Sequence, residues 1–87
     1  MISIYNEEVK AYLKFIDDQN PLHTYIVPGQ MIVQMALENQ RLYWTSFRVK
    51  YIESIEIGEQ ISFFMSDDDT LVVSNQNDIL KIKIIKV

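Results

Sequence analysis

The sequence predicts a single α+β domain, spanning residues 1–87, in which an antiparallel sheet is wrapped around one central helix. A segment of helical periodicity near the middle of the chain is apolar on most of its sides, which indicates a helix covered by other structure. Stretches of alternating apolar and polar residues follow it, separated by clusters of turn-forming residues. Helices combined with a run of such strands are typical of α+β folds.

The first elements are a short strand over residues 2–5 and a helix that follows it. Asn6 is expected to cap this helix, because Glu7 and Glu8 lie in its first turn, where negative charge suits the helix dipole. The apolar residues of the helix recur at helical spacing, at Val9, Tyr12, Leu13 and Ile16. Residues 17–21 are expected to end it, since a proline disfavours the α conformation of the residue before it.

A second helix is expected from about Gln30 to Gln40, directly after a Pro28-Gly29 break. Its polar residues form one narrow stripe, consisting of Gln30, Gln34, Glu38 and Arg41. Its other sides are apolar, with Met31, Ile32, Val33, Met35, Ala36 and Leu37. Methionines suit flexible ligands, but at these spacings Met31, Met35 and Met65 are favoured as core residues.

The rest of the chain predicts a meander of four strands, within residues 46–51, 60–65, 71–73 and 80–84. Turns are expected at Gly58 and at residues 66–70 and 75–78. Lys81, Lys83 and Lys86 are interpreted as the solvent face of the last strand, protecting an edge from aggregation. A change of phase at Ile85 and Val87 indicates a bulge or a strand end buried on both sides.

The composition limits the classes of function. A chain of 87 residues has a marginal core when alone, and the absence of cysteine excludes disulfides, so a homodimer is expected. Net charge −4 without a basic cluster argues against nucleic acid and anionic membranes. No apolar stretch is long enough to span a bilayer, and a cytoplasmic location is expected.

No metal site is expected. One histidine without cysteine does not suit structural zinc, and Asp67, Asp68 and Asp69 lack the spacing of a calcium loop, so they are interpreted as a hairpin turn. The aromatic pair Tyr43 and Trp44 fits either a dimer interface or the monomer core.

One segment stands out, Asp18-Gln19-Asn20-Pro21-Leu22-His23, followed by Val27-Pro28-Gly29-Gln30-Met31. Turn chemistry explains the aspartate, asparagine and proline. It does not explain His23 at this spacing, nor a Pro-Gly pair that opens a buried helix. A binding or catalytic site and an ordinary turn with a surface histidine therefore both remain as interpretations.

This segment resembles the D-x-N-P-L/I-H signature of the MaoC-like (R)-specific enoyl-CoA hydratases, which have the hot-dog fold, with a glycine at the start of the central helix. The resemblance implies that Asp18 and His23 form the catalytic acid/base pair. It also implies that the Gly29 backbone N–H binds the oxyanion. Asn20 belongs to the substrate-binding residues, where it shapes the turn that brings Asp18 and His23 together.

The implied reaction interconverts trans-2-enoyl and (R)-3-hydroxyacyl thioesters of coenzyme A or acyl carrier protein, with no cofactor. A homodimer with sheets joined edge to edge is also implied. The chain departs from the family in the short span between His23 and Gly29, where members have a longer, usually helical segment. Two alternatives remain open: a catalytically silent acyl-thioester binding module, and a dimeric interaction subunit.

Overall fold

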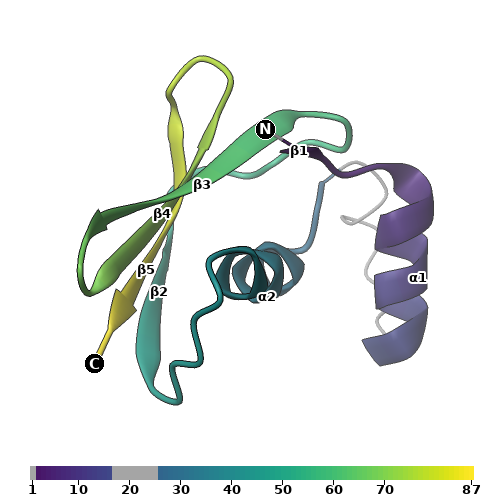
Figure 1. Cartoon of the computed structure of the whole chain (residues 1–87). Helices are drawn as coiled ribbons and strands as arrows, with labels where there is room; N and C mark the ends of the chain where they lie inside the picture. Colours follow the sequence, from purple (N-terminus) through teal and green to yellow (C-terminus); the bar gives the residue numbers. More distant parts are fainter. Residues whose placement is uncertain (1, 17–25) are drawn as a thin grey trace.

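The computed structural model of the chain describes residues 2–16 and 26–87. Within them the chain forms two helices and one five-stranded antiparallel sheet in the order β1-β3-β4-β5-β2 (Figure 1). In chain order the elements are β1 (Ile2–Ser3), α1 (Asn6–Ile16), α2 (Gly29–Asn39), β2 (Phe47–Tyr51), β3 (Gln60–Asp67), β4 (Thr70–Asn75) and β5 (Leu80–Lys86). The predicted α+β class is confirmed.

Helix α2 lies against one face of the sheet, with β4 and β5 as its neighbours (Figure 1). Ile32 and Ala36 have no exposed surface, and they pack with strand residues such as Leu71 and Ile84. Gln30, Gln34 and Glu38 are exposed, as the polar stripe predicts. The helix bounds agree with the prediction to within one residue, but Arg41 lies beyond the helix, with a positive φ of 55°.

The methionines expected in the core are there. Met31 is buried, and Met35 and Met65 are partly buried against the same cluster. The two residues of the aromatic pair differ in burial: Tyr43 is 89% exposed, whereas Trp44 packs against the core.

Helix α1 begins one position earlier than the capping prediction implies. Asn6 is its first helical residue, and the carbonyl of Tyr5 accepts hydrogen bonds from the N–H groups of Glu8 and Val9. The Glu8 carboxylate accepts a hydrogen bond from the Tyr5 N–H at 3.4 Å, which partly completes a capping arrangement. Val9 is 1% exposed and joins the core.

The predicted meander is correct for β3, β4 and β5 and wrong for β2. Strand β2 pairs with β5, in a register that sets Val49 opposite Ile84, and so lies at the far edge from β1. Residues 52–59, here called the 52–59 loop, therefore connect β2 to a strand that is not its neighbour. Alternation shows which residues face the core but carries no information on strand order.

The interpretation of Lys81 as a solvent-facing residue of an edge strand is also wrong. Strand β5 lies between β4 and β2, and Lys81 is 7% exposed. Val73 pairs with Ile82 and Ser74 with Leu80, so Lys81 is an extra residue in a β-bulge. The bulge therefore lies at Lys81 and not at Ile85, and it changes the direction of the lysine side chain.

The turns agree with their predictions. The triple-aspartate segment forms the β3–β4 hairpin, where the Asp67 carboxylate accepts a hydrogen bond from the Asp69 N–H at 2.8 Å. Gly58 has a φ of 89° in the turn closed by the Glu59 N–H and the Glu56 carbonyl. That φ suits the third residue of a type II turn, which favours glycine.

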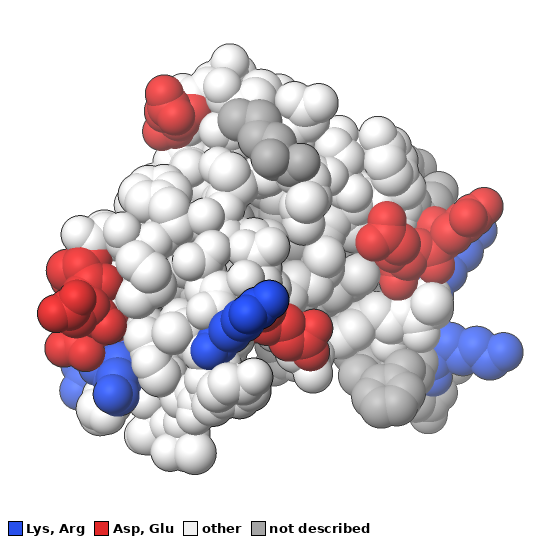
Figure 2. Space-filling model, viewed as in Figure 1, with Lys and Arg blue, Asp and Glu red and all other residues white. Residues whose placement is uncertain are grey.

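On the face shown in Figure 2, charged side chains stand mostly towards the periphery, and uncharged residues cover much of the centre. Neither of the helices described here has the length and apolar character needed to cross a membrane.

Candidate functional site

Of the predicted site residues, Asp18, Asn20 and His23 lie outside the described residues, and Gly29 lies within them. Gly29 borders a hollow of about 290 Å³ at the N-terminal end of α2. This hollow, here called the Gly29 hollow, is lined by Ile26, Val27 and Gly29, by residues 51–55 and by Ile82. Most of these side chains are apolar, so the hollow suits an apolar ligand with a polar end at Glu53 or Ser54.

Gly29 is the first residue of α2, and Pro28 occupies the capping position before it. The Pro28 carbonyl accepts the hydrogen bonds from the N–H groups of Met31 and Ile32 at 3.1 and 3.4 Å. The first N–H groups of a helix have no carbonyl partner inside that helix, and the helix dipole makes this end positive. The backbone at Gly29 is therefore suited to binding a carbonyl or developing oxyanion.

The Tyr51 ring packs directly on the backbone of Gly29. A Cβ atom added at this glycine would overlap the ring. The family resemblance assigns the Gly29 backbone to the substrate oxyanion, and the group that packs on this backbone in the structure is the ring of a tyrosine of β2. Tyr51 was not among the predicted site residues, and the sequence indicated only that it shares one face of a strand with Phe47 and Val49.

Tyr51 also borders a second hollow of about 370 Å³, here called the Leu37 hollow. Its lining includes Tyr12 of α1, Gln30 and Leu37 of α2, and Phe47 and Val49 of β2. Burial raises the pKa of the Tyr51 hydroxyl, and the nearby Tyr12 raises it further. A tyrosine hydroxyl is protonated at neutral pH even at its ordinary pKa, so Tyr51 keeps its capacity to donate a hydrogen bond.

The start of α2 is tied to the 52–59 loop by backbone contacts. The Val27 N–H donates to the Ile55 carbonyl at 2.8 Å, and Ile26 and Glu56 form an antiparallel bridge. Val27 and Ile55 are each 3% exposed. The position of this loop therefore determines where Gly29 stands relative to β2.

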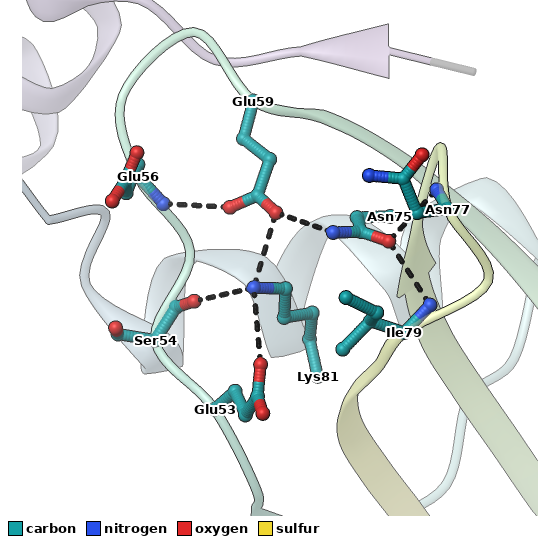
Figure 3. A network of polar contacts seen from close by, with 8 residues as sticks. All are labelled: Glu53, Ser54, Glu56, Glu59, Asn75, Asn77, Ile79 and Lys81. Atoms are coloured by element: carbon teal, nitrogen blue, oxygen red, sulfur yellow. Dashed lines mark hydrogen bonds and ion pairs between the residues drawn. The ribbon is translucent and has the colours of Figure 1, made fainter.

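Lys81 holds the 52–59 loop from inside the sheet (Figure 3). Its Nζ donates to the Ser54 carbonyl at 3.0 Å and forms an ion pair with Glu59 at 3.0 Å. A longer contact of 3.6 Å reaches Glu53, whose side chain is 53% exposed. The side chains of Lys81 and Glu59 are only 8% and 12% exposed, so this pair is shielded from water.

Glu59 has further hydrogen-bond partners. The Asn75 amide donates to it at 2.8 Å and the Glu56 N–H at 2.9 Å. Burial raises the pKa of the Glu59 carboxyl, but the hydrogen bonds from Asn75, Glu56 and Lys81, together with the lysine charge, outweigh it and keep the pKa below its ordinary value. Asn75 is in turn fixed by the N–H groups of Asn77 and Ile79, which donate to its Oδ1.

The Lys81–Glu59 ion pair was missed because alternation assigned the lysine side chain to solvent, and a glutamate beside a turn glycine does not by itself indicate a buried ion pair. Among residues 2–16 and 26–87, no group of three or more histidine, aspartate or glutamate side chains is arranged to hold a metal ion. Comparison with protein-family models, with curated proteins and with solved structures gives no match for this chain.

The ion pair predicts acid sensitivity. Because the Glu59 pKa is lower in the folded chain, its contribution is complete above about pH 4.5 and is lost as the pH falls through the folded-state pKa. Glu59→Gln should lower the free energy of unfolding by about 2 kcal/mol at pH 7 and flatten its decline below pH 4.5. Urea unfolding across this pH range measures both effects.

Glu53→Gln is the matched control, since Glu53 is more exposed and makes only the longer contact. It should change the free energy of unfolding by less than about 0.5 kcal/mol. Equal effects of the two substitutions would contradict the importance of the Glu59 pair.

A double-mutant cycle tests the Gly29–Tyr51 packing. Gly29→Ala should cost about 1 kcal/mol, because the added methyl must displace the Tyr51 ring. The same substitution in a Tyr51→Ala background should cost markedly less, which chemical unfolding of the four proteins would reveal as a coupling free energy. Additive costs would show that the ring does not restrict residue 29.

Proposed function

We propose that this chain is a MaoC-like hydratase of the hot-dog fold, which interconverts trans-2-enoyl and (R)-3-hydroxyacyl thioesters of coenzyme A or acyl carrier protein. The observation that carries the proposal is the backbone of Gly29, in the first turn of the buried helix α2 and at the wall of a largely apolar hollow. The Asp18–His23 motif precedes this glycine in the sequence, with residues 24–28 between them.

The arrangement of the elements supports the fold part of the proposal. One helix, α2, lies on a face of a five-stranded antiparallel sheet, as the family resemblance implies. The edge position of β2 is compatible with the proposed homodimer, in which sheets join edge to edge.

In the proposed reaction water adds across the C2=C3 bond of the enoyl thioester. Asp18 and His23 take a proton from the water as its oxygen bonds to C3, and they deliver a proton to C2. Negative charge develops on the thioester oxygen during the addition, and the Gly29 N–H stabilises it. The hydrogen bond is strengthened by the dipole of α2 and by the apolar surroundings.

The apolar lining of the Gly29 hollow gives the acyl chain a place to bind. Ile52, Ile55 and Ile82 contribute to that lining. Burial of each methylene of an acyl chain is worth about 0.8 kcal/mol, so a hollow of this kind contributes affinity without any new polar contact.

A hydration assay with a short trans-2-enoyl-CoA, followed by loss of the conjugated thioester absorbance, tests the proposal. The wild-type chain should turn over. Asp18→Asn and His23→Ala should each lose about 100-fold or more in rate, because each removes one member of the acid/base pair. Asp17→Asn is the matched control and should retain activity, since the adjacent carboxylate lies outside the motif.

Absence of turnover at high protein concentration would contradict the hydratase. Binding of the thioester by the same inactive protein would then identify the silent binding module, and absence of both would leave the interaction subunit.

A further inference from the structure

Tyr51 is shared by the linings of two hollows. It lines both the Gly29 hollow and the Leu37 hollow. Gly29 and Gln30 are consecutive residues of α2, and the first borders one hollow while the second borders the other. Both spaces therefore reach the first turn of α2, where the Tyr51 ring packs on Gly29.

Side chains on one face of β2 contribute to both hollows. Val49 and Tyr51 follow each other on the same face of the strand, and Tyr51 is paired with Ile82, which lines the Gly29 hollow. Val49 lines the Leu37 hollow, together with Leu37 of α2. Val49 and Tyr51, two residues of β2 that line these hollows, are therefore neighbours on one face of the strand.

The Tyr51 ring is held on few sides. It lies at the last residue of an edge strand, and 54% of its surface is exposed. It contacts Gly29, the one residue of α2 whose lack of a side chain gives the ring its place. A change of residue at position 51 therefore alters the space beside Gly29 without removing a core side chain.

We propose that Tyr51 determines acyl-chain length, by separating the Gly29 hollow from the Leu37 hollow and so restricting the bound thioester to a short chain. This inference rests on the proposed function for the chemistry of its ligand. A chain that enters beside Gly29 fills about 290 Å³ and meets the ring. Removal of the ring joins this space to a further 370 Å³ or so, which longer chains can fill.

Calorimetric titration with saturated acyl-CoA molecules tests the proposal without requiring turnover. The full chain and its Tyr51→Ala and Tyr51→Phe variants are titrated with butanoyl-CoA and with decanoyl-CoA. Each newly buried methylene should improve affinity by up to about fourfold. Tyr51→Ala should therefore raise the affinity for decanoyl-CoA, relative to butanoyl-CoA, by about tenfold or more. Tyr51→Phe, which keeps the ring, should bind like the wild type.

Two further variants distinguish the joining of the two hollows from a local effect of removing the Tyr51 ring. Tyr51→Leu, which retains an apolar contact with Gly29, replaces the alanine variant if that variant does not fold by circular dichroism. Leu37→Trp, combined with the substitution of Tyr51, fills the Leu37 hollow. This double variant should lose the gain in affinity for decanoyl-CoA and keep the affinity for butanoyl-CoA.

An unchanged chain-length preference in the folded Tyr51 variants overturns the inference, as does an absence of acyl-CoA binding by every form. Because the measurement is of binding, it is distinguishable from failure of the proposed function. If the Tyr51 variants change the chain-length preference but the protein has no hydratase activity, the specificity role of Tyr51 is supported and only the proposed enzyme activity is rejected. If the wild type is an active hydratase but the Tyr51 variants keep its chain-length preference, only the specificity role of Tyr51 is rejected.

Discussion

The ion pair between Lys81 and Glu59 positions the candidate site. Lys81 also donates to the Ser54 carbonyl, so the 52–59 loop is held at two points, Ser54 and Glu59. The Ile55 carbonyl of that loop accepts from Val27, just before α2 begins. A buried ion pair costs desolvation, and hydrogen bonds from neighbours offset this cost. We infer that the pair serves less to add net stability than to specify one position for the loop and for Gly29.

The elements of the fold follow from residue patterns, but their arrangement does not. Helix α2 was predictable because three glutamine and glutamate positions mark one exposed stripe on an otherwise apolar helix. The hairpins β3–β4 and β4–β5 were predictable from the turn residues between their strands. The position of β2 beside β5 was not predictable, because alternating apolar and polar side chains are compatible with any neighbouring strand. The bulge at Lys81 was not predictable either, because a single extra residue reverses the direction that alternation assigns.

The site was predictable in part, on the side of α2. A Pro-Gly pair before an apolar helix indicated an N-terminus with accessible backbone N–H groups, and Gly29 lies at that position. Asp18, Asn20 and His23 stay predictions, since they lie outside the described residues. Tyr51 was missed because its contact with Gly29 joins positions far apart in sequence. A helix N-terminus beside an apolar hollow is what the proposed thioester chemistry requires of this part of the chain.

The most direct measurement of the central claim is a residue-resolved nuclear magnetic resonance titration of the wild-type chain with butanoyl-CoA, an unreactive saturated analogue of the proposed substrate. We expect the largest changes in amide chemical shift at Gly29 and Gln30, with a response at Tyr51, because the thioester oxygen would bind the first turn of α2. Changes confined to a remote region, such as the hairpin at residues 67–70, would contradict the account, as would no change at saturating ligand.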